Sequence, residues 1–244
     1  MREREDAFGR MLLDHLEGRH AAEVIERSDG YVDVPGGPKA YFEPFRRWLA
    51  VERKAMRFVR GRVLDVGVGA GRVALHLQER GHEVVGIDNS PLTVEVARRR
   101  GVKDARVMPF AEIGPKLGVF DTVVMMCNNF GLFGSANGAR RLLRRLSRIT
   151  AEDARIVAGS RDPYGTDKPE HRSYHQQNRR DGRMGGQLRL RVRHGIYRTP
   201  FFDYLLVAPD EMRELAFAGG WEVERLVEPH EDDPNYYVGV LRKR

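Results

Sequence analysis

Short apolar runs alternate with segments of helical periodicity through the middle of the chain. The runs are rich in valine and isoleucine and end at glycine or polar residues, which is typical of strands buried in a parallel sheet. Ser90 and Ser135 stand where a hydroxyl can cap the first turn of a helix, and Gly81 and Gly101 stand where a helix can end. The pattern therefore predicts an α/β fold with strands at 62–67, 82–88, 105–109, 120–128 and 154–160 and helices at 71–81, 90–101 and 135–150.

The first sixty residues show helical patterns on either side of a loop. Apolar residues between Phe8 and Leu16 recur near one face, which predicts a helix from Met1 to about Ser28. A second helix is predicted from Pro44 to about Val59, where apolar residues recur at helical spacing. The prolines and glycines of the segment 31–44 predict a loop between the two helices.

The pattern changes after Ser160. The segment 161–186 is polar and spotted with glycine, which predicts a loop or lid. The segment 187–209 predicts two antiparallel strands around a turn at His194-Gly195, with Leu188, Leu190 and Val192 on one side and Arg189, Arg191 and Arg193 on the other. A helix at 209–220 and two final strands at 221–228 and 235–244 complete the prediction.

Composition places the chain among folded proteins. Its 244 residues suffice for one substantial core, with 41% hydrophobic and 32% charged residues. No apolar run approaches the ~20 residues that span a bilayer, and the first twenty residues lack the apolar core of a signal peptide. We therefore expect a cytoplasmic location and no membrane partner. Cys127 is the single cysteine, which excludes an internal disulfide and a cysteine cage for a metal, and we interpret it as a small buried residue.

The formal net charge of +7 is compatible with an acidic partner such as RNA. Only six of the 42 basic residues are lysine, and such an arginine bias also arises from codon usage or adaptation to heat. Arginines gather in the predicted lid and hairpin, where they could bind an acidic substrate or RNA phosphates. The interpretation that we favour is the solvated face of an edge hairpin, where charge blocks aggregation. These arginines are Arg179, Arg180, Arg183, Arg189, Arg191 and Arg193.

The turn after the first predicted strand of the α/β segment carries three glycines, in Asp65-Val66-Gly67-Val68-Gly69-Ala70-Gly71. A phosphate-binding P-loop would close with Gly-Lys-Ser/Thr, but Arg72 and Val73 follow Gly71. The dinucleotide fingerprint G-x-G-x-x-G fails as well, because its third glycine would fall at Arg72. The spacing that remains is Asp-x-Gly-x-Gly-x-Gly.

The stretch "VLDVGVGAGRV" resembles motif I of the class I S-adenosylmethionine-dependent methyltransferases. Glycines let the backbone approach a ligand closely, and the free N–H groups of the helix after Gly71 suit the carboxylate of the methionine moiety. Asp65 suits the ammonium group of the same moiety. The resemblance thus predicts S-adenosylmethionine as cofactor and S-adenosylhomocysteine as product. The cofactor-binding residues predicted in this turn are Asp65, Gly67, Val68, Gly69 and Gly71.

The resemblance covers about residues 61–160 and extends more loosely to the C-terminus. It implies a seven-stranded doubly wound sheet, mostly parallel, with the last strand inserted antiparallel between the fifth and the sixth. In the family, substrate contacts come from the N-terminus and from insertions after the fourth and fifth strands. We therefore expect a single methyltransferase domain over 1–244, with an N-terminal helical cap at 1–60, the cofactor-binding core at 61–160, a lid and hairpin insertion at 161–208, and a C-terminal helix and strand pair at 209–244.

The ends of the next two strands add candidates. Asp88 ends the second strand, about twenty residues after the glycine turn, where an acid can accept both ribose hydroxyls. Asn89 is a further cofactor candidate, although a simple turn former explains it as well. By resemblance Phe110, Ala111 and Glu112 line the adenine, and Glu112 accepts from its amino group. A solvated glutamate at a helix start is the alternative for Glu112.

The fourth strand ends in "MMCNNFGLF", at the position of motif IV of the family. Nucleic-acid amino-methyltransferases that resemble this family carry Asn/Asp-Pro-Pro-Tyr/Phe here. This chain has Asn128-Asn129-Phe130-Gly131 without prolines, which argues against methylation of a base nitrogen. We predict Asn128 at the cofactor side of the reaction centre, with Asn129 and Phe130 as substrate candidates. Core packing is the alternative for Phe130.

Methyl transfer needs positioning above all, because its leaving group is already activated, and it needs a base only when the acceptor loses a proton early. The lid offers His171, Tyr174 and His175 as candidates for a base. Arg161 and Tyr164 are substrate candidates. Ordinary packing or solvation is the alternative for each of these residues. The spacing of the two histidines also suits a metal, but no third ligand accompanies them, so we predict no metal site.

Three functions remain open from the sequence. The first is a methyltransferase that acts on oxygen or nitrogen of a small-molecule acceptor. The second is an RNA methyltransferase that uses the basic lid. The third is a non-catalytic protein that binds S-adenosylmethionine or its demethylated product. The identity of the acceptor and the oligomeric state are not determined by the sequence.

Overall fold

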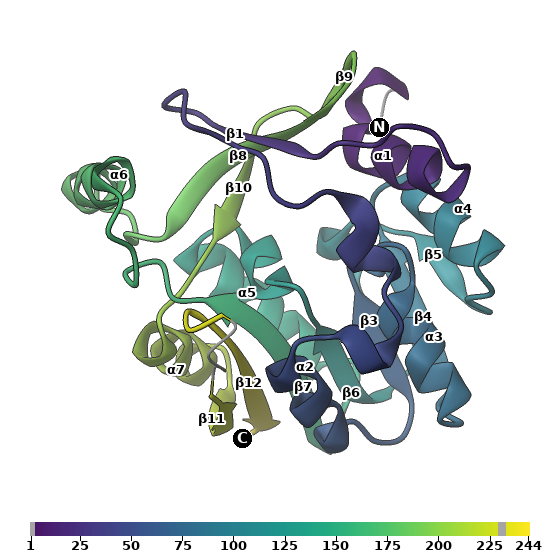
Figure 1. Cartoon of the computed structure of the whole chain (residues 1–244). Helices are drawn as coiled ribbons and strands as arrows, with labels where there is room; N and C mark the ends of the chain where they lie inside the picture. Colours follow the sequence, from purple (N-terminus) through teal and green to yellow (C-terminus); the bar gives the residue numbers. More distant parts are fainter. Residues whose placement is uncertain (1–2, 229–232) are drawn as a thin grey trace. The chain divides into compact units, whose positions relative to one another are not determined.

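A seven-stranded sheet forms the framework of the chain, of which the computed structural model describes residues 3–228 and 233–244 (Figure 1). Its strands lie in the order β11-β12-β7-β6-β3-β4-β5. β3, β4 and β5 are parallel to one another, as are β6 and β7, and β12 is antiparallel to β7 and β11. This confirms the predicted Rossmann-like sheet and the insertion of the last strand. The strands are β3 (Val63–Val66), β4 (Val84–Asp88), β5 (Ala105–Val107), β6 (Phe120–Met125), β7 (Thr150–Arg161), β11 (Trp221–Val227) and β12 (Tyr236–Lys243).

The helices of the α/β segment are also present where the pattern predicts them, as α3 (Arg72–Glu79), α4 (Pro91–Arg99) and α5 (Ala136–Ser147). The Ser90 hydroxyl accepts from an N–H in the first turn of α4, and Ser135 does the same for α5. The capping predictions are therefore correct.

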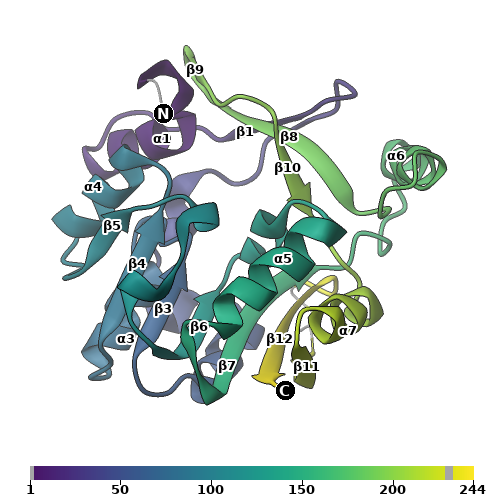
Figure 2. The same cartoon turned by 180° about the vertical axis from the view of Figure 1, so that it is seen from behind.

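The chain forms two compact units. The first contains the described residues up to Trp48 together with Val63–Glu112 and Arg189–Phe202, and the second contains the rest. In the second unit α5 packs against α7 (Pro209–Ala218), and α2 (Ala50–Ala55) packs against β12. α2 lies in front of the strands in Figure 1 and α5 lies in front in the reversed view of Figure 2, so these helices cover opposite faces of the sheet.

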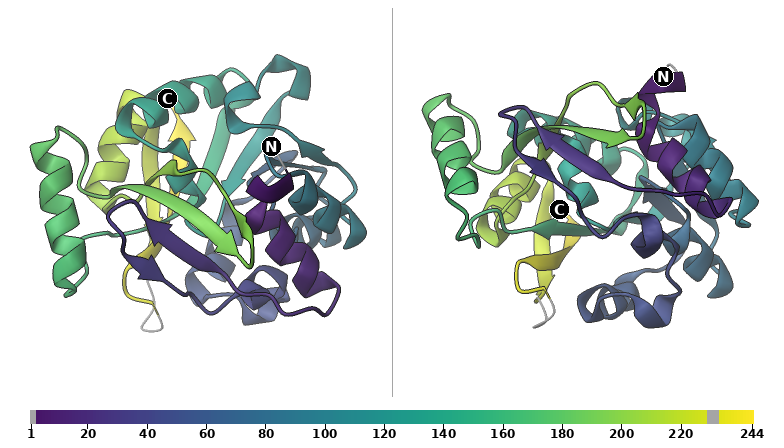
Figure 3. Two further views of the ribbon diagram at one scale, coloured as in Figure 1. Left: turned by 90° about the horizontal axis from the view of Figure 1, so that it is seen from above. Right: turned by 45° about the horizontal axis from the view of Figure 1, so that its top comes forward.

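In the first unit α1 (Ala7–Leu16) lies along α4 (Figure 2). Met11 and Leu12 of α1 form an apolar cluster with Val96 of α4 and with Ala70 of the glycine turn. A smaller antiparallel sheet, visible in Figure 3, has the order β10-β8-β1-β2, and β9 pairs with β8. Its residues before Arg189 in β8 and after Phe202 in β10 belong to the second unit. These strands are β1 (Val24–Arg27), β2 (Val32–Asp33), β8 (Gln187–His194), β9 (Tyr197–Arg198) and β10 (Phe202–Leu205).

The prediction of a helix from Met1 to Ser28 is wrong beyond Leu16. Gly18 has a φ of +74°, a left-handed conformation that ends the helical turn. β1 follows and pairs with β8, so that Ile25 lies opposite Val192. The partner is far away in the sequence, and local periodicity therefore gives no sign of this strand.

The helix predicted from Pro44 to Val59 is interrupted. It consists of the 3-10 turn η3 (Phe45–Arg47), helix α2 and the 3-10 turn η4 (Met56–Phe58). Trp48 and Leu49 are extended between η3 and α2. The buried Trp48 indole N–H donates to the Glu43 carbonyl at 2.9 Å, and this contact fixes the break.

The segment 161–186, predicted to be a loop, contains helix α6 (Pro169–Arg180). It has almost no apolar residues, so a hydrophobic period could not reveal it. Instead, the buried Asn178 amide donates to the carbonyls of Gly185 and Gln187 at 2.9 and 2.7 Å. The predicted turn at His194-Gly195 is confirmed, but the second strand of the hairpin divides into β9 and β10.

Five further 3-10 turns connect these elements: η1 (Glu3–Glu5), η2 (Pro38–Phe42), η5 (Phe110–Glu112), η6 (Pro115–Leu117) and η7 (Asn129–Phe133). Among the helices in the described ranges, none is long and apolar enough to cross a membrane.

Candidate cofactor and reaction site

The glycine turn has a backbone that only glycine adopts readily. Gly67, Gly69 and Gly71 have φ values of +74°, +53° and +81°. A Cβ on Gly71 would lie 2.6 Å from Cγ2 of Val102, so space as well as conformation requires glycine there. The N–H groups of Gly67 and Val68 donate to the Ile87 carbonyl at 2.9 and 3.0 Å, which ties the turn to β4. The turn thus leads directly from β3 into the N-terminus of α3.

Asp65, near the end of β3, is 2% exposed and carries an unused acceptor. It accepts a backbone hydrogen bond from Ala74, but its Oδ2 has no hydrogen-bond partner within the described residues. Burial, reinforced by the nearby charge of Asp88, raises the pKa of Asp65 to about 8. A buried acceptor without a donor is costly, and the ammonium group of a bound ligand would satisfy it. Asp65 therefore fits the predicted methionine-binding role.

Asp88 ends β4 beside the same turn. Its Oδ2 accepts from the Gly69 N–H at 3.3 Å and its Oδ1 accepts from the Ser90 N–H at 3.1 Å. Burial raises the pKa of Asp88 to about 6. The carboxylate is held at the carboxyl edge of the sheet, where ligands bind in open α/β folds.

The remaining cofactor candidates of this unit follow the same sheet edge. Asn89 is exposed directly after Asp88. Phe110 is half-buried, and Ala111 and Glu112 are exposed on η5 just after β5. The structure thus brings the glycine turn, Asp88 and η5 to the carboxyl ends of three adjacent parallel strands.

Asp6 belongs to this arrangement and was missed by sequence reasoning. It is buried and caps α1 by accepting from the Gly9 N–H. The Ser90 hydroxyl donates to Asp6 Oδ1 at 2.6 Å, and the Leu92 N–H donates to Oδ2 at 3.2 Å. Its negative charge also raises the pKa of Asp88. The sequence marks Asp6 as a possible cap, but no signal connects it to a serine 84 positions away.

In the second unit, two consecutive residues after β6 adopt left-handed conformations. Cys127 and Asn128 have φ values of +56° and +65°, which is uncommon outside glycine. The Tyr204 hydroxyl donates to the Asn128 carbonyl at 2.6 Å, and the Cys127 N–H donates to the Tyr236 hydroxyl oxygen at 3.2 Å. The side-chain oxygen of Asn128 is buried without a partner in the described part of the chain. Such held strain is characteristic of functional turns.

The neighbouring substrate candidates differ in accessibility. Asn129 begins η7 and is half-buried. Phe130 is fully buried and meets Phe133 edge to face at 4.8 Å between ring centroids. Packing against Phe133 accounts for the position of Phe130.

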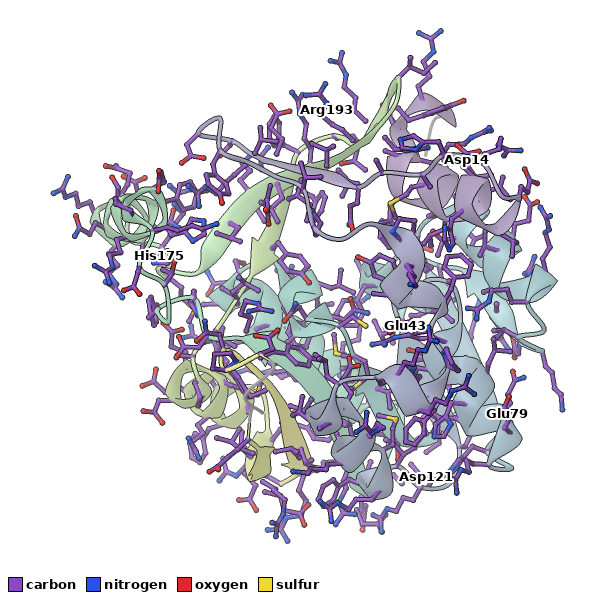
Figure 4. The ribbon with its side chains drawn as sticks, in the orientation of Figure 1. Asp14, Glu43, Glu79, Asp121, His175 and Arg193 are labelled. Carbon is purple, nitrogen blue, oxygen red and sulfur yellow. The ribbon has the colours of Figure 1, made fainter. Side chains whose placement is uncertain are left out.

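The lid candidates form two groups in the second unit. The Tyr164 hydroxyl donates to Glu211 at 2.5 Å, and burial together with this contact raises the pKa of Tyr164 to about 12. His175, labelled on α6 in Figure 4, is buried with its ring edge-on to Tyr164 at 5.5 Å. Arg161 forms an ion pair with Asp233 at 2.8 Å.

The other two lid candidates lie on α6 as well. His171 Nδ1 lies 3.1 Å from the Thr166 hydroxyl, and Tyr174 is half-buried. No group of three or more histidine, cysteine, aspartate or glutamate side chains within residues 3–228 and 233–244 could hold a metal ion.

The arginines of β8 are paired with an acid. Glu26 of β1 accepts two hydrogen bonds from Arg191, at 3.0 and 2.7 Å, and one from Arg193 at 3.3 Å. β8 itself is not an edge strand, because it lies between β1 and β10, whereas Arg189 and Arg193 are exposed as the solvated-face interpretation predicts. Its charges serve the pairing of β8 with β1.

Comparison with known proteins places this arrangement in a family. The family model described as "Methyltransferase domain" matches residues 63–153. A methyltransferase from Bacteroides fragilis, solved in complex with S-adenosyl-L-homocysteine, is 27% identical, and the match covers 100% of this chain and 97% of that chain with a TM-score of 0.81.

Curated relatives agree over shorter stretches. Demethylmenaquinone methyltransferase of Thermus thermophilus is 36% identical over 110 residues, which are 39% of this chain and 45% of the relative. Ubiquinone biosynthesis O-methyltransferase of Methylocella silvestris is 37% identical over 84 residues, 32% of this chain and 33% of the relative. The chain therefore spans less than half the length of these relatives. Together with the glycine turn and the strand order, these matches show that the chain belongs to the class I S-adenosylmethionine-dependent methyltransferase family.

Proposed function

We propose that the protein transfers the methyl group of S-adenosylmethionine to an oxygen or nitrogen atom of a small-molecule acceptor. The observation that carries this proposal is the Asp65–Gly71 turn, in which a buried carboxylate oxygen without a partner in residues 3–228 and 233–244 lies beside a left-handed glycine backbone. S-adenosylmethionine, when bound, supplies a methyl group on a positively charged sulfur that is already activated for transfer. The protein's part is then to bind, orient and exclude water.

Each cofactor candidate has a defined part in this proposal. Asp65 binds the ammonium group and the N–H groups at the start of α3 face the carboxylate. Asp88 accepts the ribose hydroxyls from a position fixed by Gly69 and Ser90. Phe110 and Glu112 line the adenine. Asn128 is the candidate for the region of the reacting sulfur, since its side-chain oxygen is buried without a partner among the described residues.

A small-molecule acceptor is favoured over RNA by two observations. The names of two similar enzymes refer to demethylmenaquinone and to ubiquinone biosynthesis. In addition, Arg191 and Arg193 are paired with Glu26, which reduces the cationic surface available to phosphates. Their pairing weakens the case for the RNA alternative.

Titration calorimetry with S-adenosylmethionine, S-adenosylhomocysteine and NAD tests the cofactor. We expect both adenosyl compounds to bind and NAD not to bind. Asp65→Ala and Asp88→Ala should each weaken binding at least tenfold, about the worth of one charge-assisted hydrogen bond. Binding of NAD in preference to S-adenosylmethionine would contradict the proposal.

A matched pair of glycine variants tests the turn itself. In Gly71→Ala the added Cβ would clash with the Val102 side chain, so this variant should bind the cofactor more weakly. Gly81, which follows α3, has a similar φ of +87° but open space around it, so Gly81→Ala carries the same backbone strain without the clash. Equal binding by the two variants would show that the turn does not touch the cofactor.

The acceptor is sought by incubating the protein and labelled S-adenosylmethionine with separated metabolite and RNA fractions, followed by mass spectrometry of the labelled product. A labelled small molecule supports the proposal, and labelled RNA supports the alternative. Tight binding of the cofactor without any methyl transfer would instead indicate a non-catalytic binding protein.

A further inference from the structure

A carboxyl group that none of the roles above uses is buried in the first unit. Glu23, directly before β1, is only 5% exposed. The Tyr41 hydroxyl donates to it, with its oxygen 3.3 Å from Oε1 and 3.2 Å from Oε2. Within the described residues this phenol is its one hydrogen-bond partner, and no cation pairs with it. A buried carboxyl held by a phenol alone is costly, and such groups are enriched at functional sites.

Tyr41 links this carboxyl to the apolar cluster that contains one residue of the predicted methyl-donor turn. Its ring meets Phe8 of α1 edge to face at 5.2 Å between centroids. Tyr41 and Phe42 pack against the cluster that contains Ala70 of the glycine turn. Arg100 donates to the carbonyls of both Ala70 and Phe42, so that one guanidinium joins the turn to η2. Glu23 is thus connected to the turn through Tyr41 and the apolar cluster that includes Ala70.

The groups around Glu23 leave it suited to take up a proton near neutral pH. Burial, with a smaller contribution from the charge of Asp33 on β2, raises the pKa of Glu23 to about 7. On the β8 side, His194 Nδ1 lies 3.1 Å from the carbonyl of Ala22, and Nε2 of the same ring lies 2.9 Å from Asp14 of α1, labelled in Figure 4. A base is most effective when its pKa is close to the working pH.

We propose that Glu23, oriented by Tyr41, is the base that removes the proton from an O–H or N–H methyl acceptor. This inference rests on the proposed function and narrows it to acceptors that carry an exchangeable proton. The acceptor's lone pair forms the bond to the methyl carbon while the carbon–sulfur bond breaks with its electron pair left on sulfur. The acceptor's proton passes to a Glu23 oxygen and then to water. One positive charge is lost from sulfur and one proton is released, so charge balances.

The decisive measurement is the titration of the Glu23 carboxyl carbon by ¹³C NMR in complexes with S-adenosylmethionine and with S-adenosylhomocysteine. The two ligands differ in the positive charge on sulfur. If Glu23 faces the reacting sulfur, that charge should lower the midpoint of its titration by roughly half a pH unit or more. Glu23→Gln identifies the signal.

Glu26 is the matched control, because it lies on β1 only three positions away and pairs with arginines instead. Its titration should be the same in the two complexes. Equal midpoints for Glu23 in the two complexes would overturn the inference while leaving the proposed function intact. If neither ligand binds, it is the proposed function that fails.

The second measurement is the rate of methyl transfer to the acceptor that the incubation with labelled S-adenosylmethionine identifies. Glu23→Gln should lower kcat by about 100-fold or more and leave the affinity for S-adenosylhomocysteine unchanged. Glu23→Asp should restore part of the rate, and Tyr41→Phe should shift the acidic limb of the pH–rate profile. Wild-type turnover by folded Glu23→Gln would refute the role of Glu23 as a base.

Discussion

At the scale of single residues, the burial of Asp65 opposes the stability of the fold. Its carboxyl is buried and accepts one backbone hydrogen bond, while its second oxygen has no described partner. A carboxylate in this position destabilises the folded chain, and a cationic ligand would remove that cost. The Asp65 carboxylate thus lowers the stability of the folded chain and favours the binding of a cationic ligand.

This leads to a pH-dependent prediction for stability. Asp65 titrates near 3.8 when unfolded and near 8 when folded, so between these values the folded chain binds more protons. The free energy of unfolding should therefore fall as pH rises from about 4 to 8. Asp65→Asn should remove this pH dependence. At pH 8.5 the free energy of unfolding of the variant should exceed that of the wild type by roughly 2–5 kcal/mol.

Denaturant unfolding at pH 4, 6 and 8.5 measures the effect. Asp88 and Glu23 act in the same direction in both proteins, because burial raises their pKa values too, so only the difference between the curves reports on Asp65. Parallel curves for the variant and the wild type would contradict the prediction.

At the scale of elements, two serine caps allow a contact within one helix to be compared with a contact between two helices. Ser90 and Ser135 each cap a helix by accepting from an N–H in its first turn. Ser90 also donates to the buried Asp6 of α1. Gly9 permits this contact, since a Cβ there would lie 2.3 Å from the Ser90 hydroxyl oxygen. The start of α4 is thus joined to the start of α1.

We predict unequal losses for the two serine-to-alanine variants. Ser135→Ala should lower the free energy of unfolding by about 1 kcal/mol, the usual worth of a cap. Ser90→Ala should lower it by about 2–3 kcal/mol, because it also removes the hydroxyl donor of the buried Asp6, which keeps only the N–H groups of Gly9 and Leu92. Denaturant titration of the pair is the measurement, and equal losses would mean that Asp6 gains nothing from Ser90.

The elements also show which parts of the fold could be predicted from sequence. β3 and β4 were predictable because a strand buried on both faces is mostly apolar, with Asp65 and Asp88 as the charged exceptions. β1 was not, because its pairing with β8 depends on residues more than 160 positions away. α6 was not, because its stability comes from the Asn178 contacts and not from an apolar face.

The residues of the candidate site also differ in whether they could be predicted from the sequence. The spacing of the glycines and of Asp88 is a local pattern with a direct physical meaning, so a ligand-binding turn could be predicted from it, and the family resemblance suggested the methyl donor as its ligand. Asp6 and Glu23 could not be inferred. Each takes its chemistry from burial and from a partner on another element, Ser90 for the first and Tyr41 for the second.

At the scale of the whole molecule, the number of basic residues, 42, overstates the cationic surface that a partner meets. Arg191 and Arg193 share the carboxylate of Glu26, and these arginines hold the pKa of Glu26 below its usual range. Composition alone could not distinguish such internal pairing from a surface open to nucleic acid.

Removing the negative charge of Glu26 should therefore strengthen the binding of the protein to polyanions. We predict that Glu26→Gln elutes from a heparin column at a higher salt concentration than the wild type, because two guanidinium groups lose their partner. Glu224→Gln, which loses a pairing with the single arginine Arg155, is the control and should shift elution less. If Glu26→Gln elutes at the same salt concentration as the wild type, pairing with Glu26 does not limit the access of polyanions to Arg191 and Arg193.

The place of β12 in the sheet has a consequence for synthesis of the chain. β12 lies between β7 and β11, yet it is the last of the three to leave the ribosome. Until residues 236–243 emerge, the edge of β7 remains open and β11 has no neighbour in the sheet. The nascent chain therefore exposes the unpaired backbone N–H and C=O groups of β7 until residues 236–243 have been made, and this part of the sheet can close only after translation has passed β12.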